Sequence, residues 1–563
     1  MRRCAIATAV SVLSLLIGAT TADAVTLTVT STSDSGAGSL RQTIAEASPG
    51  ETIALPASTS PYLVTSGTIH VEKNLTIMGA GASSTVISGM GTAENGLEIG
   101  NANVTVDGLT LTGMGDIALD LTEGELTLSG VVVTGDGKET IDGGGISTSE
   151  NTTLTVNASS IESNQGNEGG GVFIDGEATI NNSTIANNVS QHGDGGGLQS
   201  RGTLTLSGDT IARNTGHSSG GGLFVEKQAT IVNSTIVENQ AMFGAGIESR
   251  GMLTLLNDTI ARNQSGGPAD GGGIAGTATA TNTIIAENTD KEGAVDNCRD
   301  SLTSNGPNLE NGSECKFSIG KANPVIGPLA NNGGPTQTEK LLAGSAAIEA
   351  GTNTGCPTTD QRGVVRPVGP LCDIGAVEFA PPAATTGTAT SITQSSATLN
   401  GVVNSLGLGG LSWHFQWGPS TSYGNQTPNT TSAAFGSEGV AATISGLPAG
   451  STIHYQLVVS DSEGTSFGAD QILQTAPSVP AAAPPAKCVV PRLRNLSLKK
   501  AKRALAKAHC TLGRVKQPKH LSRSQKKKLV VLKQSPAAAK ALAAGARVQV
   551  TLGLPVKHHK HKA

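Results

Sequence analysis

The chain has 563 residues, with 38 Lys plus Arg, 43 Asp plus Glu and a formal net charge of −5. A prior of roughly one domain per 150 residues suggests about four domains. With 74 glycines and only 2% aromatic residues, the composition argues against an ordinary globular enzyme. It favours many short stacked strands with cores of Val, Ile, Leu and Thr.

Residues 1–24 are predicted to be a secretory signal peptide. Arg2 and Arg3 form a charged start, an apolar stretch follows, and an A-x-A cleavage site ends at Ala24, which makes Val25 the first mature residue. The alternative is an uncleaved anchor helix. No later apolar run approaches about 18 residues, so we expect no membrane span once the signal is removed.

A period of about 25 residues organises the next part of the chain. A Gly-Gly-Gly-apolar tetrad recurs, with a Gly-Ala-Gly variant, at Gly143, Gly169, Gly195, Gly220, Gly244 and Gly271. An Ile-x-x-Asn motif keeps the same period, with its asparagines at Asn164, Asn188, Asn214, Asn239, Asn263 and Asn288. Two motifs that share one period predict a solenoid.

The repeats lack the apolar spacing of helices and show short alternating bursts separated by Gly and Asn, which are turn residues. Three strands for each period make one coil of a β-helix. The isoleucines are then expected to stack as an internal ladder, and the asparagines to form a hydrogen-bonded ladder at a turn, with a ligand site as the alternative. Residues 39–47 are predicted to form a helix, with Leu40 and Ile44 on one face, that caps the first coil.

The tetrad and the Ile-x-x-Asn motif resemble those of right-handed parallel β-helix proteins of the pectin-lyase-like fold. We assign residues 25–321 to such a β-helix with its N-terminal cap, in a chain that is mainly β. The resemblance implies a fold that hosts polysaccharide lyases and glycoside hydrolases, and fold alone does not decide function.

Acidic residues precede several of the tetrads. Glu168, His192, Asp194 and His217 lie on adjacent coils and are the candidate catalytic residues. Asp142, Glu168 and Asp194 are expected about 5 Å apart on consecutive coils, which makes them a candidate Ca²⁺ site, although no cofactor is required. The alternative is a row of solvated turn residues. It is favoured because a catalytic site normally interrupts a repeat.

Residues 322–379 resemble the choice-of-anchor Q domain of secreted β-helix proteins, on the segments 327–336, 360–363 and 372–378. They are assigned as a C-terminal segment of the β-helix. The segment departs from that family at Glu339-Lys340, where His-Ala is usual, and at two missing prolines. The resemblance implies no catalytic residues, so Asp360, Arg362 and Asp373 are interpreted as structural ion pairs.

Residues 380–476 show period-two alternation, with Trp413, Phe415 and Trp417 on one strand face. This pattern predicts a β-sandwich, and the segment 446–464 resembles a fibronectin type III domain. The aromatic residues are interpreted as core, with a sugar-stacking platform as the alternative.

Residues 477–486 form a Pro/Ala linker, after which the charge inverts. From Lys487 to Ala563 there are 21 Lys plus Arg and no Asp or Glu, so the rest carries 17 basic and 43 acidic residues, a net −26. Residues 487–553 resemble a PASTA domain, with a helix over 497–509 and strands near 488–491, 528–534 and 548–553. The resemblance implies recognition of peptidoglycan. Residues 554–563 are a basic His/Lys tail.

Six cysteines remain after signal removal, in three local pairs. Sequential disulfides and an oxidising compartment are expected, with free buried thiols as the alternative. The expected pairs are Cys298–Cys315, Cys356–Cys372 and Cys488–Cys510.

Together these features predict a secreted, extracellular, cell-wall-associated surface protein. The β-helix would be an elongated carbohydrate- or surface-binding element, with a polysaccharide as its expected ligand. The PASTA-like module would bind peptidoglycan or another anionic wall polymer. The alternatives are a secreted polysaccharide lyase or glycoside hydrolase, or an adhesin. Nucleic acid is not expected as a partner, because the chain is exported and its basic end lacks interleaved aromatic residues.

Overall fold

The structure is a computed structural model. The predicted signal peptide lies outside the described residues, as do residues 556–563 of the basic tail and part of the Pro/Ala linker. The chain divides into two compact units, Met1–Ala476 and Pro477–Ala563. The described residues are 25–92, 94–300, 302–406, 410–434, 436–461, 463–479, 483 and 486–555.

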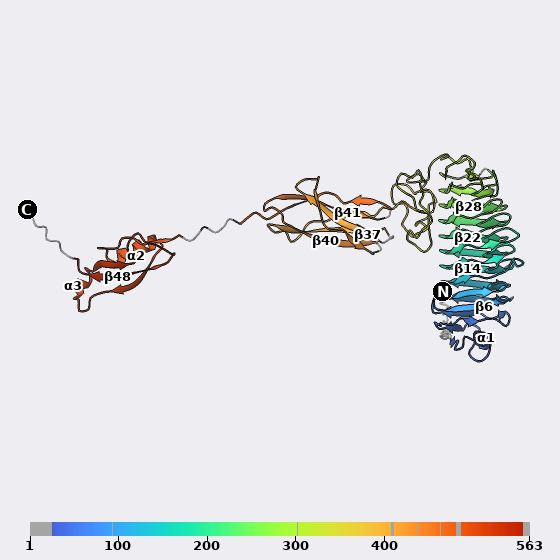
Figure 1. The fold of residues 1–563 in the computed structure, drawn as a ribbon, viewed down its shortest axis with the longest axis horizontal. Coiled ribbons are helices and arrows are strands. Elements are labelled where there is room, and N and C mark those ends of the chain that lie inside the picture. The colour runs from blue at the N-terminus through green and yellow to red at the C-terminus, as the bar shows by residue number, and fades with distance from the viewer. Residues whose placement is uncertain are drawn as a thin grey trace, which may run out of the picture. The chain divides into compact units, whose positions relative to one another are not determined.

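A right-handed parallel β-helix forms the N-terminal part of the first unit, as predicted (Figure 1). Three parallel sheets, of twelve, nine and eleven strands, run along it. The twelve-stranded sheet contains, in spatial order, β1 (Thr26–Thr28), β2 (Thr52–Leu55), β5 (Leu75–Gly79), β8 (Ala102–Asp107), β11 (Gly124–Ser129), β14 (Thr153–Asn157), β18 (Glu177–Asn181), β22 (Thr203–Ser207), β25 (Gln228–Val232), β28 (Met252–Leu256), β31 (Thr279–Thr281) and β33 (Thr303–Ser304).

The other two sheets complete each coil. The nine-stranded sheet contains β4 (Ile69–Val71), β7 (Leu97–Ile99), β10 (Leu119–Leu121), β13 (Ile146–Thr148), β17 (Val172–Ile174), β21 (Leu198–Ser200), β24 (Leu223–Val225), β27 (Ile247–Ser249) and β30 (Ile274–Gly276). The eleven-stranded sheet contains β3 (Tyr62–Leu63), β6 (Val86–Thr92), β9 (Thr110–Met114), β12 (Val132–Thr134), β15 (Ser160–Glu162), β19 (Thr184–Ala186), β23 (Thr210–Ala212), β26 (Thr235–Val237), β29 (Thr259–Ala261), β32 (Ile284–Ala286) and β34 (Leu309–Glu310). A short pair, β16 (Gln165–Gly166) and β20 (Val189–Ser190), adds to two of the turns.

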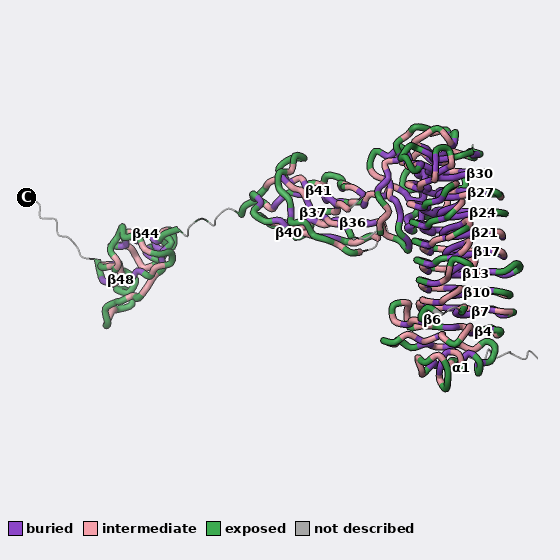
Figure 2. The backbone as a smooth tube through the Cα atoms, turned by 45° about the vertical axis from the view of Figure 1, so that its right-hand side comes forward, coloured by how far each residue is buried: buried purple, intermediate pink, exposed green. Residues whose placement is uncertain are grey.

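Aliphatic ladders fill the interior of the β-helix, and Figure 2 shows buried residues along the stacked strands. The repeat isoleucines pair coil to coil in register from Ile161 to Ile285, and all of them are fully buried. At the N-terminal end, α1 (Leu40–Glu46) begins after its N-cap Ser39 and buries Leu40 and Ile44. The prediction of a helix at residues 39–47 is therefore confirmed.

The repeat asparagines form the predicted ladder at a turn, and they are buried. The Asn214 Nδ2 donates to the carbonyl oxygen of Ile185 at 2.9 Å and to the Oδ1 of Asn239 at 3.0 Å. The Asn214 Oδ1 in turn accepts the backbone N–H of Asn188 at 2.9 Å. The same bonds recur in neighbouring coils, so the ladder satisfies backbone groups that the turn would otherwise leave unpaired.

The glycine tetrad has a steric reason tied to this ladder. Its first glycine has a positive φ, as at Gly220 (63°), which turns the chain into the next strand. Its third glycine faces the asparagines: a Cβ built at Gly222 would lie 2.9 Å from the Nδ2 of Asn239 and 2.7 Å from the carbonyl oxygen of Gly246. Only glycine leaves room for the asparagine side chain there.

A second ladder, which the sequence did not reveal, connects the twelve- and eleven-stranded sheets. One short oxygen-bearing side chain per coil accepts the backbone N–H of the preceding ladder residue. For example, the Ser183 N–H donates to the Asp209 Oδ1 at 2.7 Å, and the Ser234 N–H donates to the Asp258 Oδ1 at 2.9 Å. The members are Ser159, Ser183, Asp209, Ser234, Asp258, Thr283 and Asn308.

The two carboxyl groups of this ladder make stability depend on pH. Burial raises the pKa of Asp258 to about 8 and raises the pKa of Asp209 well above its usual value. Because both folded-state pKa values exceed the unfolded ones, both contributions to the free energy of unfolding are complete below about pH 4 and decrease as the pH rises, that of Asp258 until about pH 8. Asp136 and Asp373, with pKa values raised by burial to about 7, act in the same direction.

We therefore expect the free energy of unfolding, measured by urea denaturation, to decrease between pH 5 and pH 8. The decrease should be up to about 1.4 kcal/mol for each unit of pKa shift at Asp258, and the urea midpoint should fall with it. Asp258→Ser places the ladder's usual residue there, so the decrease should become smaller. An unchanged pH dependence in that variant would show that Asp258 is not the titrating group.

Residues 322–379 differ from the predicted continuation of the β-helix, because the described part of this segment contains no strand. It lies as irregular chain along the outer face of the eleven-stranded sheet. The Gln361 side chain bonds to the Asp209 carbonyl oxygen at 2.9 Å and to the Thr235 hydroxyl at 2.6 Å. Farther along, the Asn282 Nδ2 donates to the Thr352 carbonyl oxygen at 2.9 Å. Its motif residues form side-chain contacts with existing coils, and they do not pair as a new coil.

Buried ion pairs hold this segment together, as interpreted from the sequence. Arg362 pairs with Asp360 at 2.9 Å, and Arg366 pairs with Glu378 at 2.7 Å. Asp373 has a different role from the expected ion pair, since its carboxylate accepts backbone N–H groups, including that of Glu349 at 2.7 Å. All of these groups are buried, which favours a structural role.

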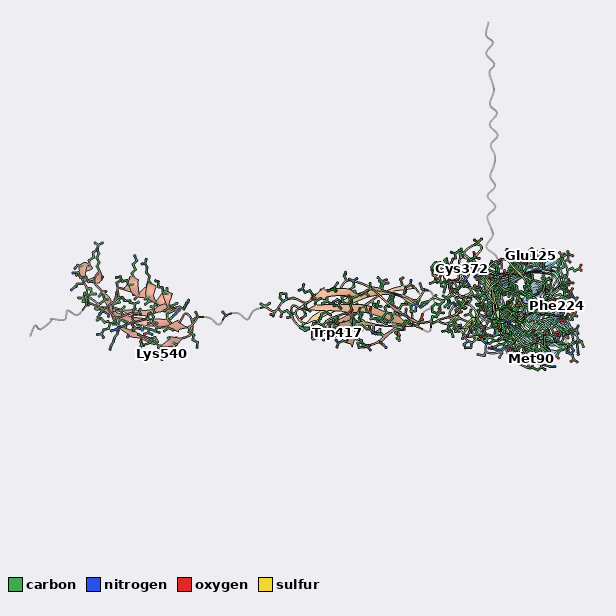
Figure 3. The ribbon with its side chains drawn as sticks, turned by 90° about the horizontal axis from the view of Figure 1, so that it is seen from above. Met90, Glu125, Phe224, Cys372, Trp417 and Lys540 are labelled. Carbon is green, nitrogen blue, oxygen red and sulfur yellow. A yellow bond between two sulfur atoms is a disulfide. The ribbon has the colours of Figure 1, made fainter. Side chains whose placement is uncertain are left out.

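Residues 383–474 form two antiparallel sheets packed face to face, in agreement with the predicted β-sandwich. Trp413, Phe415 and Tyr455 are buried between them, so the core interpretation of Trp413 and Phe415 is confirmed. Trp417, which is labelled on this part of the chain in Figure 3, is half-buried. The strands are β35 (Ala383–Thr386), β36 (Ser396–Asn404), β37 (Leu411–Gly418), β38 (Asn425–Gln426), β39 (Thr430–Ser432), β40 (Ser437–Ser445), β41 (Thr452–Ser460), β42 (Thr465–Phe467) and β43 (Gln471–Gln474).

The second unit is a small α+β fold. Its helix α2 buries Ala501 and Leu505 against a three-stranded sheet of order β45-β48-β46. The predicted helix and strands are present, and β45 is an addition. Its elements are β44 (Cys488–Val489), α2 (Leu498–Lys507), β45 (Thr511–Lys516), α3 (Arg523–Lys526), β46 (Val530–Ser535), β47 (Ala541–Leu542) and β48 (Arg547–Gly553).

The three predicted disulfides are all present. They join Cys298 to Cys315, Cys356 to Cys372, and Cys488 to Cys510. None of the helices in the described residues is long and apolar enough to cross a membrane.

Candidate functional site

The predicted acidic row lies in the turns that lead into the nine-stranded sheet, and each carboxylate there has a protein partner. The Asp142 Oδ1 accepts the Asn167 side-chain amide at 2.8 Å. The Glu168 carboxylate pairs with Arg201 at 2.6 Å. The Asp194 Oδ1 accepts a backbone N–H at 2.9 Å. The coils therefore bring these acids to one face, where each bonds to a side chain or a backbone N–H of another coil.

Arginine–phenylalanine stacks on the same face were missed from the sequence. The Arg201 guanidinium lies 4.8 Å from the Phe173 ring centroid, and that of Arg250 lies 4.7 Å from the Phe224 centroid. Arg250 also approaches Asp194 at 3.9 Å. In each stack the ring comes from one coil and the arginine from the next, so the pairing appears only when the coils are aligned.

This arrangement argues for charge compensation over acid–base catalysis. A glycosidase uses two carboxyl groups that flank a bond, and a calcium site needs several oxygen ligands on one ion. Here Glu168 is bound by both Arg201 and the Gln199 amide, the latter at 2.9 Å. The described residues contain no group of three or more His, Cys, Asp or Glu placed to hold a metal ion.

The two candidate histidines lie together, as the shared repeat position predicted. The His192 and His217 ring centroids are 6.3 Å apart in an edge-to-face arrangement. Both are on the turns beside the nine-stranded sheet, and His217 lines an open cavity of about 700 Å³ with Met242, Phe243 and Lys291. The four candidate catalytic residues thus lie on one face, but the acids Glu168 and Asp194 already bond to Arg201 and to a backbone N–H.

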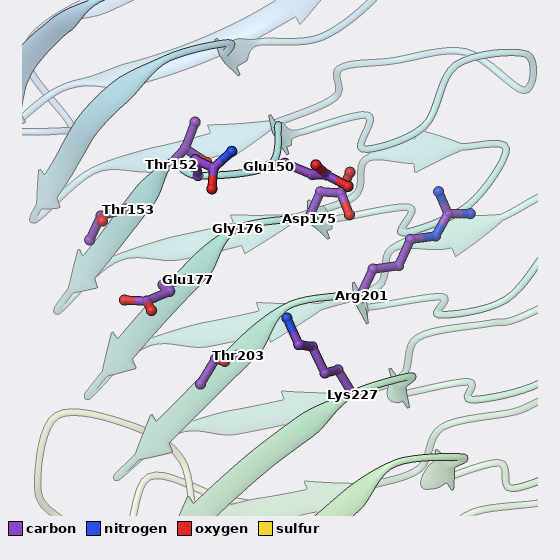
Figure 4. Close-up of a pocket in the computed structure, with 10 residues that line it drawn as sticks. Glu150, Thr152, Thr153, Asp175, Gly176, Glu177, Arg201, Thr203 and Lys227 are labelled. Carbon is purple, nitrogen blue, oxygen red and sulfur yellow. The ribbon is translucent and has the colours of Figure 1, made fainter.

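A polar cleft of about 510 Å³ opens where the nine-stranded sheet turns into the twelve-stranded sheet (Figure 4). Three acids, Glu150, Asp175 and Glu177, line it together with Arg201 and Lys227. The cleft spans neighbouring coils and offers both donors and acceptors, which suits a polar ligand rich in hydrogen-bonding groups.

A row of threonines lies beside this cleft on the outer face of the twelve-stranded sheet. Every strand of the sheet contributes one, in register, about 4.8 Å from the next, and none of their hydroxyls bonds to another described residue. The positions two residues before these threonines also face outward, but their residue types vary, as at Glu177, Gln228 and Met252. An outward position on this sheet therefore does not itself require threonine. The row is Thr26, Thr52, Thr76, Thr105, Thr127, Thr155, Thr179, Thr205, Thr230, Thr254, Thr279 and Thr303.

The second unit presents an uncompensated positive surface. Of the 21 Lys plus Arg in residues 487–563, three (Lys557, Lys560 and Lys562) lie outside the described residues, which leaves 18 on the described part of this unit. The unit has no Asp or Glu in its sequence, and no ion pair occurs among its described residues. A surface of one sign attracts polyanions and repels polycations.

Comparison with known proteins supports the fold assignment of the first part. No curated protein matches the chain. Two similar solved structures are of the sensor domain of the anti-sigma factor RsgI4 of Pseudobacteroides cellulosolvens, with 19% and 16% sequence identity. The matches cover 17% and 18% of this chain, and 97% and 96% of the RsgI4 chains. Each has a TM-score of 0.15. Residues 141–290, which contain the tetrads and the asparagine ladder, match the family model described as a right-handed beta helix region.

Proposed function

We propose that this chain is an exported protein that attaches to an anionic polymer of the cell wall through its C-terminal unit. The observation that carries the proposal is the set of 18 cationic side chains, with no acidic residue, on the folded residues 487–555. The resemblance of this unit to PASTA domains makes peptidoglycan the first polymer to test.

Export is supported by two features. Residues 1–24 have the composition of a signal peptide. The three disulfides fit an oxidising compartment. The resemblances of residues 322–379 to a choice-of-anchor Q domain and of residues 380–476 to a fibronectin type III domain are in keeping with a multi-module surface protein.

We assign the β-helix the role of an elongated carbohydrate-binding element. The threonine row offers evenly spaced, unpaired hydroxyls along the axis, and the cleft of Glu150, Asp175 and Lys227 opens beside it. Hydroxyl-rich polymers form hydrogen bonds with such surfaces. The alternative of a lyase or glycoside hydrolase has less support, because Glu168 and Asp194 have structural partners. An adhesin would use the same faces with a different ligand.

Sedimentation with insoluble peptidoglycan tests the proposal. We expect residues 25–563 to sediment and residues 25–486, which retain the whole first unit, to stay in solution. Binding of the longer form should weaken steeply as salt is raised, because salt screens exposed charges. Insoluble cellulose, which is uncharged, serves as the control surface. If neither form sediments with peptidoglycan, the attachment role is wrong, and the first unit should then be assayed on soluble acidic polysaccharides.

A further inference from the structure

Two arginines of the second unit line one cavity and have no partner. Arg514 lies on β45 and Arg547 begins β48, and both border an open cavity of about 580 Å³. Neither guanidinium bonds to another described residue of the unit, and residues 477–563 contain no Asp or Glu. The remaining lining residues, Thr511, Leu512, Gly513 and Gln549, are uncharged.

The local backbone brings these two side chains to the same cavity. β45 and β48 pair in parallel, with Thr511 opposite Arg547, and the register then shifts between Leu512 and Val515. Such a bulge redirects the side chains that it contains, and Arg514 lies within it. Gly513 keeps the space beside Arg547 open, since a Cβ there would lie 3.3 Å from the Arg547 Cβ.

From this geometry we infer that Arg514 and Arg547 form an oxyanion site, which takes a phosphate or carboxylate group of the polymer bound by the unit. A guanidinium presents a planar fork of N–H donors that matches two oxygens of such a group, so two adjacent forks bind one anion more specifically than scattered lysines do. This inference deepens the proposed function and rests on it: the whole unit attracts the polymer, and this site orients it.

Calorimetric titration of the full chain with two soluble probes, linear polyphosphate and polyglutamate, tests the site. We expect Arg514→Gln/Arg547→Gln to weaken binding of the preferred probe by about tenfold. The matched control, Lys499→Gln/Lys502→Gln, removes the same charge from neighbouring exposed positions of α2 and should weaken it by about twofold to threefold.

The outcomes separate the two claims. A larger loss in the arginine pair supports the site, and the probe that shows it, polyphosphate or polyglutamate, identifies phosphate or carboxylate as the bound group. Equal losses in the two double variants overturn the site while leaving diffuse attraction to polyanions intact. Failure of the unaltered chain to bind either probe overturns the site, whereas sedimentation with peptidoglycan decides the proposed attachment. Arg514→Lys/Arg547→Lys keeps the charge, and full binding by that variant would also overturn the site.

Discussion

Replacing Asn214 by alanine is expected to lower the free energy of unfolding of the β-helix by on the order of 4 kcal/mol. The Asn214 side chain is fully buried and forms hydrogen bonds with the coils on both sides. Its loss leaves the backbone N–H of Asn188 without its acceptor and removes one acceptor of the Asn188 Nδ2, whereas the Asn239 Oδ1 keeps the backbone N–H of residue 214. Each buried polar group left unpaired costs about 1–3 kcal/mol.

The effect should be local at first, because each coil contacts only its neighbours. Hydrogen exchange measured by mass spectrometry should therefore show lost protection in the coils around Asn188 and Asn239, together with a lower urea midpoint. Thr205→Ala is the matched control, since it truncates an outward side chain on a neighbouring strand and should change stability by less than about 0.5 kcal/mol. Equal effects of the two substitutions would mean that the ladder is not a main source of stability.

The β-helix could be predicted from the sequence because its requirements repeat. The glycines and Asn164, Asn188 and Asn214 recur as the same residue types at one period, since each coil must satisfy the same turn in the same way. The second ladder escaped notice because its requirement is only a short oxygen acceptor, which Ser183, Asp209 and Thr283 all meet. Residue identity therefore varies while the bond is kept.

The candidate site could be predicted only in part. Their positions in the repeat were enough to predict that Glu168, Asp194 and the two histidines lie on one face. Their partners were not evident, because Arg201 is separated from Glu168 by 33 residues and bonds to it across coils. In residues 322–379 the motifs resemble those of a known domain, but the hydrogen bond between Gln361 and Thr235 joins positions 126 residues apart. No local pattern encodes such contacts.

The functional consequence of the regular coils is a long surface with few interruptions. Under the proposed function, the neutral threonine row and the cationic basic unit would each bind a polymer in preference to a small substrate. A repetitive ligand can make the same contact many times, so weak individual contacts add along its length. If the β-helix binds a polysaccharide as proposed, its affinity should increase with the length of the polymer, and short oligosaccharides should bind weakly.

Substituting alanine for Gly222 should lower the free energy of unfolding by about 3 kcal/mol, because overpacking a rigid interior forces the backbone to move. The added Cβ would meet the Gly246 carbonyl oxygen at 2.7 Å and the Asn239 Nδ2 at 2.9 Å. Gly222 does not have a positive φ, so the cost is steric and not conformational. Gly439→Ala is the control: its Cβ meets nothing within 4 Å, and the change should be neutral or slightly stabilising.

The link between this glycine and the ladder can be measured directly. If Gly222 is glycine because Asn239 needs the space, then Gly222→Ala should cost less in a chain that already has Asn239→Ala. The two substitutions would then be coupled by more than about 0.5 kcal/mol in a double-mutant cycle of urea unfolding. Strictly additive costs would instead assign the glycine to the close approach of the Gly246 carbonyl alone. The tetrad would then be a requirement of coil stacking, independent of the asparagines that recur beside it.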